Sequence, residues 1–247
     1  VDLSAGRGIT RADTYEEAAL AIRKAFSHSR DSHIIIEPFI EGTQHACCTF
    51  LINKKVVAYC TNNEYSFVNP YRVEIDTYPA DNFDSVRDIL ITEAEKMARL
   101  LNLSDGILSM QYLLRDGEPH IMEAMRRILG NLYMIPASDL NRFNWDYWET
   151  RVRCGLGCND FPNETEQKGF FAYRAVHGYK NGEVANVVVP EEFSQFIYDE
   201  CVLWEPGYVI EDYMSEPLGF LFFKFSSREE MMEVMLNKYS SIYVEYR

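Results

Sequence analysis

The stretch QYLLRDGEPHIMEAMRRILG, residues 111–130, constrains the fold of this chain more than any other segment. Two apolar runs flank a turn-forming sequence at residues 115–118, which predicts a β-hairpin. We predict a three-residue loop with Gly117 in the left-handed region, because that loop length puts Gln111 and Glu123 on one face. A two-residue loop would turn Glu123 to the opposite face.

The predicted face of this hairpin changes from apolar to charged along its length, through Leu113, Gln111, Glu123, Met125 and Arg127. Carboxylate and amide oxygens are ligands that Mg²⁺ prefers, and a guanidinium matches phosphate geometry. A nucleotide has the same polarity, from adenine to phosphates. The simpler alternative is an ordinary salt bridge between Glu123 and Arg127 at a strand end.

The remaining periodicities predict an α+β fold with mostly antiparallel strands. A capping box of Thr14 and Glu17 begins the first helix, and Ser227 with Glu230 begins the last. The predicted helices cover residues 15–26, 83–101, 145–153 and 228–239. The predicted strands cover residues 34–36, 44–52, 55–62, 169–178, 183–189, 199–205 and 217–224. Residues 63–80 are expected to be irregular.

The charge of the chain limits the partners that it can have. Its formal net charge is −14, which disfavours nucleic acid and anionic membranes as main partners. No run of 18 apolar residues is present, so no membrane span is expected. The adjacent Cys47 and Cys48 lie in an apolar run with strand character. We therefore expect the six cysteines to be reduced and the protein to be cytoplasmic.

Three separate stretches, DLSAGRGI (2–9), IIIEPFIEG (34–42) and the hairpin, resemble the ATP-grasp superfamily. The likeness is strongest to its carboxylate–amine ligase, biotin carboxylase and carbamoyl-phosphate synthetase branch, and it covers essentially the whole chain. It implies a partial lid subdomain at 1–42 and a central subdomain at 43–160 with a mostly antiparallel sheet and flanking helices. A C-terminal α+β subdomain at 161–247 would follow.

The resemblance also implies a nucleotide site. The small residues of the glycine-rich loop would cover the phosphates through their backbone amides. In the linker after Glu37, the carbonyl of Pro38 and the amide of Ile40 would read adenine, and Leu113 would lie under the ring. Gln44 and His45 lie where the family contacts ribose or phosphate. Gln44 replaces the usual Glu, and a lone histidine in a strand more often has a structural role. The implied loop residues are Ser4, Ala5, Gly6 and Gly8.

In the hairpin, the resemblance assigns Gln111 and Glu123 as ligands of Mg²⁺ or Mn²⁺, with Arg127 stabilising an acyl phosphate or its transition state. Met125 departs from the family pattern, which usually has Asn as a third ligand there. A thioether is a poor ligand for a hard cation. The alternatives are therefore two ions held largely by the phosphates of ATP, weaker metal binding, or one ion instead of two.

The implied activity is that of an ATP-dependent ligase, which phosphorylates a small carboxylate so that an amine or similar nucleophile can attack it. The alternative, favoured by Gln111 and Met125, is a non-catalytic or regulatory nucleotide-binding relative. The family's lysine-bearing strands and N-terminal domain precede the segment that begins at Val1. We thus expect this chain alone to bind nucleotide weakly and to turn over little. Tyr and Phe residues after 168 would suit an interface between copies of the chain.

Overall fold

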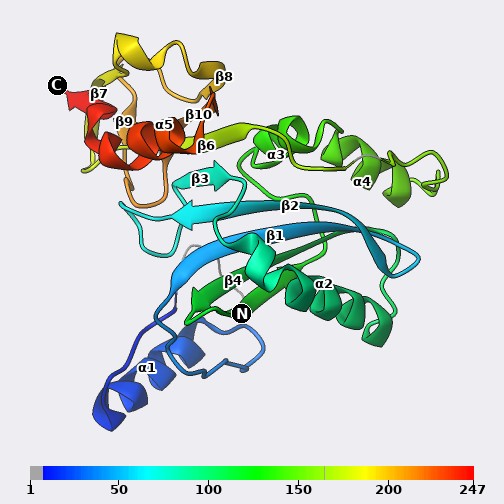
Figure 1. The fold of residues 1–247 in the computed structure, drawn as a ribbon. Helices are drawn as coiled ribbons and strands as arrows, with labels where there is room; N and C mark the ends of the chain where they lie inside the picture. Colours follow the sequence, from blue (N-terminus) through cyan, green and yellow to red (C-terminus); the bar gives the residue numbers. More distant parts are fainter. Residues whose placement is uncertain (1–7, 164) are drawn as a thin grey trace.

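An eight-stranded antiparallel sheet forms the frame of the protein (Figure 1), as the computed structural model of residues 8–163 and 165–247 shows. The strand order is β5-β4-β1-β2-β3-β6-β10-β8. This architecture confirms the predicted α+β class. In chain order, the strands are β1 (Thr43–Ile52), β2 (Lys55–Tyr65), β3 (Ile75–Tyr78), β4 (Gly106–Arg115), β5 (Glu118–Met125), β6 (Phe170–His177), β8 (Ile197–Val202) and β10 (Pro217–Phe225).

Helix α2 (Phe83–Leu100) covers one face of β1, β2 and β4. Its buried side chains Val86, Leu90 and Ala94 recur at helical spacing, and they pack against alternate strand residues such as Met110. Burial of this apolar stripe stabilises the helix more than its intrinsic propensity does. The prediction of a helix over 83–101 is confirmed.

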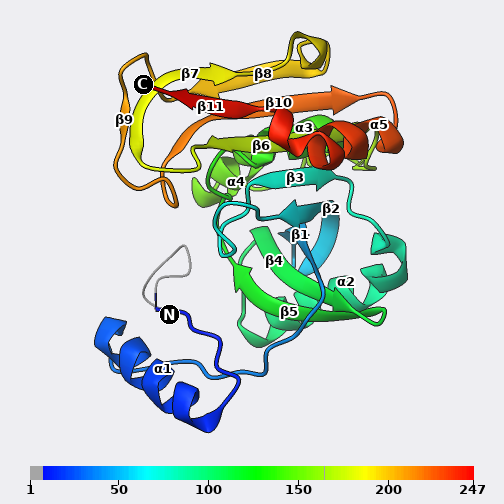
Figure 2. The same ribbon diagram turned by 90° about the vertical axis from the view of Figure 1, so that its left-hand side faces the viewer.

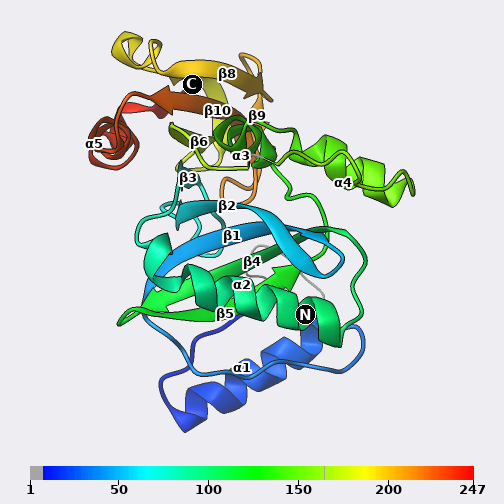
Figure 3. The ribbon, with the colours of Figure 1, turned by 45° about the vertical axis from the view of Figure 1, so that its right-hand side comes forward.

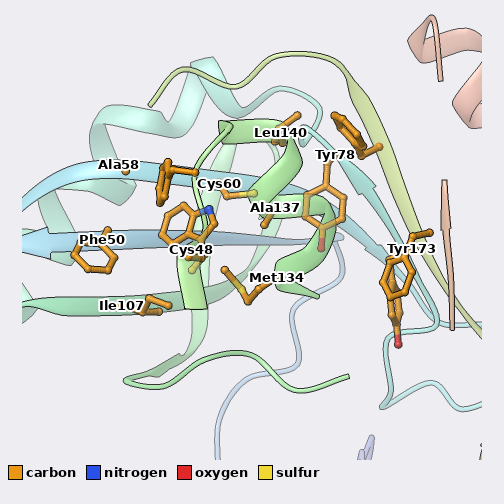
Figure 4. Packing of buried hydrophobic residues seen from close by; sticks show 14 of the residues in the cluster. Cys48, Phe50, Ala58, Cys60, Tyr78, Ile107, Met134, Ala137, Leu140 and Tyr173 are labelled. Carbon is orange, nitrogen blue, oxygen red and sulfur yellow. The ribbon is translucent and has the colours of Figure 1, made fainter. Parts of the chain in front are cut away.

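Helices α3 (Met134–Asn141) and α4 (Trp145–Arg153) cover the opposite face of the same sheet. Figure 4 shows Met134 and Leu140 of α3 beside Cys48 and Cys60, and the fully buried Trp145 completes this core. The sequence did not predict α3, which is short and contains Pro136. That proline lies in the first turn, where no helical hydrogen bond needs its missing N–H.

The last third of the chain extends the sheet beyond β3 through β6, β10 and β8, and it adds α5 (Arg228–Met232) and a small sheet (Figure 2). Ser227 caps α5 as predicted, and a π-helical turn (Glu233–Asn237) continues it against β6 and β10. The predicted helix end near residue 239 is a 3₁₀ turn instead. A small sheet in the order β11-β7-β9 lies alongside. Its strands are β7 (Gly182–Val188), β9 (Val209–Ile210) and β11 (Tyr243–Tyr246).

Helix α1 (Tyr15–His28) lies apart from the C-terminal strands, on the other side of β4 and β5 (Figure 3). The predicted capping box is present, but no residue of α1 is buried. The predicted buried strand at 34–36 is wrong. Ile35 and Ile36 are 71% and 73% exposed, because no strand in the described part of the chain pairs with this segment. β-Branched residues favour a strand only where a ladder and a packed face are available.

Among the described residues, no helix is both long and apolar enough to cross a membrane. The three cysteines Cys47, Cys48 and Cys60 are buried as free thiols in the two cores of the central sheet.

Candidate functional site

The hairpin of β4 and β5 is present, but its loop is shorter than predicted. Arg115 pairs with Glu118, which leaves only Asp116 and Gly117 in the loop, with φ of 52° and 82°. The prediction of a three-residue loop is therefore wrong. Asp-Gly tolerates positive φ at both positions, and a turn with two such residues matches the twist of the strands.

A β-bulge, and not the loop, brings Gln111 and Glu123 onto the same face of the hairpin. Tyr112 pairs with Ile121, whereas the preceding residue Gln111 pairs with Glu123, so Met122 is an extra residue in β5. A bulge of this kind shifts the register by one residue and returns the next side chain to the required face. Gln111 and Glu123 consequently lie directly opposite one another, as predicted.

Gln111 lies on the sheet face that α3 and α4 cover farther along β4. It pairs with Ala46 of β1, whose neighbour on the same face, Cys48, is in the core under these helices. Leu113 pairs with Gln44 on the same face, and both are half-buried. In the part of the chain that the structure describes, the end of this face that α3 and α4 leave uncovered runs from apolar Leu113 to Glu123, which is exposed.

The structure adds a carboxylate that sequence reasoning missed. Glu64 of β2 accepts hydrogen bonds from Gln111 Nε2, at 3.0 Å to Oε1 and 2.8 Å to Oε2. Gln44 Nε2 donates to Glu64 Oε2 at 2.7 Å. Burial raises the pKa of Glu64, the amide hydrogen bonds lower it, and the charge of Glu123 raises it further.

A second missed carboxylate, Asp76 of β3, pairs with Glu64 across the sheet. Asp76 is buried and accepts from Asn62 Nδ2 at 3.0 Å and from the Tyr78 hydroxyl at 3.2 Å. Burial and the nearby Glu64 charge raise its pKa well above the ordinary value. Both acids lie within residues 63–80, and the prediction that this segment is irregular is wrong, because it contains the end of β2 and all of β3. The alternation of polar and apolar residues in EID (74–76) is the signal that would have found Asp76, whereas NNEY (62–65) shows no such alternation.

His45 lies on the face opposite Gln111. It is buried, stacks on Tyr112 with 5.3 Å between ring centroids, and its Nε2 is 2.7 Å from Thr43 Oγ1. Burial lowers the pKa of this histidine. His45 therefore lies away from the face that carries Gln111 and Glu123, and its contacts are those of a structural histidine.

The linker before β1 ends at Gly42, which lies against the backbone of β4. A Cβ at Gly42 would lie 2.6 Å from the Leu114 carbonyl oxygen, so only glycine fits where the linker enters β1. Upstream, Glu37 and Pro38 are exposed and Ile40 is half-buried. These residues are irregular and leave backbone groups outside any ladder, as backbone recognition of a base requires.

The glycine-rich loop is described only at its end. Gly8 has a φ of +83°, and a Cβ there would lie 3.4 Å from Cβ of His28 at the end of α1. Ser4, Ala5 and Gly6, which were predicted to contact phosphates, lie outside the described residues.

Strand β5 ends at Met125, which pairs with Ser109 and shares the face of Glu123. Arg127 follows the strand, is exposed and donates to the Ile128 carbonyl at 3.0 Å. Its neighbour Arg126 is half-buried and donates to the carbonyls of Ile107 and Ser104. Arg126 therefore anchors the strand end, whereas the side chain of Arg127 is exposed.

The donor set fits a hard cation that a triphosphate also coordinates. Glu123 supplies carboxylate oxygens and Gln111 one amide oxygen, and phosphate oxygens commonly complete an Mg²⁺ sphere. Within the described residues, no group of three or more His, Cys, Asp or Glu side chains forms an all-protein metal cage. The pair suits an ion that arrives with nucleotide.

No family model matches the chain. It is 28% identical over 124 residues to a D-alanine–D-alanine ligase of Parabacteroides distasonis, covering 47% of this chain and 37% of the ligase. Among solved structures, an L-amino acid ligase of Bacillus licheniformis matches with a TM-score of 0.73 and 18% identity, over 85% of this chain and 55% of that one.

Two further structures match nearly the whole chain. A phosphoribosylglycinamide synthetase of Anaerococcus prevotii has a TM-score of 0.69 and 14% identity, over 96% of this chain and 61% of that one. The biotin carboxylase domain of the Hydrogenobacter thermophilus 2-oxoglutarate carboxylase was solved with MgADP and bicarbonate. It has a TM-score of 0.76 and 15% identity, over 98% of this chain and 56% of that one.

These similar structures are ATP-grasp enzymes, so the fold of this chain is the ATP-grasp fold. Within that fold, the similar proteins are the amino acid ligases, the phosphoribosylglycinamide synthetase and the biotin carboxylases, which is the branch that the three motifs predicted. The chain spans about a third of the curated relative and between 55% and 61% of these solved structures.

Proposed function

We propose that this chain is most of the ATP-grasp module of an ATP- and Mg²⁺-dependent ligase, with subdomains at 1–42, 43–160 and 161–247. The module would activate a small carboxylate as an acyl phosphate for attack by an amine or similar nucleophile. The observation that carries the proposal is the direct pairing of Gln111 with Glu123 on an uncovered sheet face. The ligases among the similar proteins support the reaction class.

Each residue of the site has a role that its position allows. Gln111 and Glu123 would hold Mg²⁺, which supplies charge neutralisation for phosphoryl transfer. Leu113 would contact the adenine. Arg127, free of buried partners, would neutralise charge that develops on the transferred phosphoryl group. The protein contributes positioning and electrostatics and needs no covalent nucleophile.

The linker and the glycine-rich loop would complete the nucleotide site. The carbonyl of Pro38 and the amide of Ile40 would bind the adenine edge, and Gln44 would lie near the ribose or phosphates. Residues 4–8 would donate backbone amides to the phosphates. Closure of such a loop excludes water and so strengthens every charge interaction in the site.

A cellular location also follows as a proposal. Cys47 is fully buried, and burial raises the pKa of its thiol to about 12. Adjacent buried thiols that stay unpaired suit a reducing compartment. We therefore propose a cytoplasmic enzyme.

Thermal denaturation of the full chain with ATP, Mg²⁺ or both tests the proposal. A ligand that binds the folded state raises the unfolding temperature. ATP and Mg²⁺ together should therefore raise this temperature by more than the sum of the shifts that ATP alone and Mg²⁺ alone produce. Glu123→Gln should remove the part of the temperature shift that requires Mg²⁺. Glu118→Gln, an exposed change in the same hairpin, should keep it. Equal shifts for both variants would refute the metal role of the hairpin, and no shift of the full-length protein with any nucleotide would refute the function.

A further inference from the structure

Two glutamine side chains turn their amide nitrogens toward one carboxylate. Glu64 Oε2 accepts from Gln44 Nε2 at 2.7 Å and from Gln111 Nε2 at 2.8 Å, and Glu64 Oε1 accepts from Gln111 Nε2 at 3.0 Å. Glu64 is half-buried and belongs to β2, whereas Gln111 belongs to β4 and Gln44 to the strand between them. The hydrogen bonds therefore tie three adjacent strands at the site.

The chemistry of the groups decides which way the Gln111 amide points. An ionised carboxylate has only acceptors, so it takes the NH₂ end of an amide and repels the oxygen end. Once Gln111 Nε2 is bound to Glu64, Gln111 Oε1 must face away from it. The oxygen is the only atom of this amide that a hard cation can use. A free amide rotates and can present either end.

We propose that Glu64 is a positioning residue that fixes the Gln111 amide with its oxygen toward the cation shared with Glu123. This inference rests on the proposed metal role of the hairpin. Partners that orient a ligand in this way commonly change metal affinity by about 10- to 100-fold when they are removed. Both Glu64 oxygens already accept from amides, which distinguishes its role from that of a direct ligand.

The role offers a rescue that a merely structural residue would not show. Glu64→Gln removes the acceptor-only partner, so the Gln111 amide loses its fixed orientation. In the double variant Glu64→Gln with Gln111→Glu, position 111 has a carboxylate, both of whose oxygens can bind metal in either orientation. The amide at position 64 can then donate to it, which preserves the hydrogen bond and the total charge.

Binding of Mn²⁺ to the full chain with saturating ADP, followed by electron paramagnetic resonance, tests this proposal. Glu64→Gln should weaken Mn²⁺ binding by about 10- to 100-fold, and the double variant should restore it to within a few-fold of wild type. ADP binding without metal should not change. Glu95→Gln on α2, which removes a carboxylate that accepts from Lys55 Nζ and from the Val56 amide of β2, should behave as wild type.

Two results would overturn the proposal. Wild-type Mn²⁺ affinity in Glu64→Gln would show that Glu64 does not orient the amide, and failure of the double variant would show that the charge at position 64 matters instead. Glu123→Gln distinguishes failure of this inference from failure of the proposed function. If this variant also leaves Mn²⁺ binding unchanged, the hairpin does not bind the metal and both are refuted.

A measurement on the wild-type chain covers the case in which the variants do not fold. The side-chain amide protons of Gln111 should exchange with solvent more slowly than those of an exposed glutamine, because both are held near Glu64. Exchange as fast as for an exposed glutamine would contradict the proposal.

Discussion

Gln111 and Glu123 lie directly opposite one another across β4 and β5, and one extra residue, Met122, sets this register. Without the bulge, a hairpin with a two-residue loop would pair Gln111 with Met122 and place Glu123 on the α2 face. The site thus depends on a local irregularity of the strand. This relationship leads to predictions about metal binding, catalysis and stability.

Replacement of Met125 should strengthen metal binding. Met125 follows Glu123 on the same face of β5, where its thioether offers nothing to a hard cation. Met125→Asn adds an amide oxygen there, and one interaction with a charged partner of about 1.5 kcal/mol corresponds to roughly tenfold in affinity. Calorimetric titration of the full chain with MgADP should show this gain. Met125→Leu serves as the control, and equal affinities for the two variants would show that position 125 does not face the ion.

The two consecutive arginines should have different functions. Arg127→Lys keeps the charge but loses the planar fork, so turnover of the full-length protein should fall by about 10²- to 10³-fold with MgADP affinity unchanged. Arg126→Ala should instead lower the free energy of unfolding, because its guanidinium donates to the Ile107 carbonyl in β4 and to the Ser104 and Asp105 carbonyls just before this strand. Steady-state kinetics and urea unfolding of both variants separate these effects. A stability loss in Arg127→Lys as large as in Arg126→Ala would contradict the assignment.

Asp76 should make the protein less stable as the pH rises. Burial and the charge of Glu64 raise its folded-state pKa well above 3.8. Between the unfolded and folded pKa values, the folded state holds more protons, so this group's contribution to the unfolding free energy falls with increasing pH. Asp76→Asn, which keeps an oxygen for Asn62 Nδ2, should flatten that fall.

Urea unfolding between about pH 4 and about pH 8 measures the Asp76 effect. Asp84→Asn, an exposed change at the start of α2, should keep the wild-type slope. If Asp76→Asn also keeps the wild-type dependence of unfolding free energy on pH, then ionisation of the Asp76 carboxyl group does not destabilise the folded state, contrary to our account.

Gly106 should not tolerate a side chain. Its φ is +116°, and an added Cβ would collide with the Glu149 carboxylate, which accepts from the Ile107 amide at 2.7 Å. Gly106→Ala should therefore cost about 1 to 3 kcal/mol of unfolding free energy. Gly130→Ala, where a Cβ meets nothing within 4 Å, should cost little. Chemical denaturation compares the two, and similar midpoints would show that β4 can shift to admit the methyl group.

The sequence predicted those parts of the fold that depend on local patterns. The α2 helix, the strands around Asn53, the capping box at Thr14 and the N-cap at Ser227 follow from periodicity and hydrogen-bonding chemistry, and all are present. The face shared by Gln111 and Glu123 was also predicted, although for the wrong reason. A bulge has no sequence signature as clear as that of a turn, so the parity was assigned to the loop.

The errors come from non-local structure. Ile34–Ile36 have strand composition, but no partner strand pairs with them among the described residues. Glu64 and Asp76 come together only because β2 and β3 pair, and the intervening loop hides that pairing in the sequence. Orientation of the Gln111 amide by Glu64, 47 positions away, is likewise a property of the folded sheet.

The most direct test of the central claim asks whether Gln111 and Glu123 hold the same cation. Mg²⁺-dependent ADP affinity of the full chain should be measured for Gln111→Ala, Glu123→Gln and the double variant. If one ion bridges the two side chains, the losses should be non-additive by about 0.5 to 3 kcal/mol. Strictly additive losses, or single variants that bind MgADP as wild type does, would show that the facing pair is not a metal site.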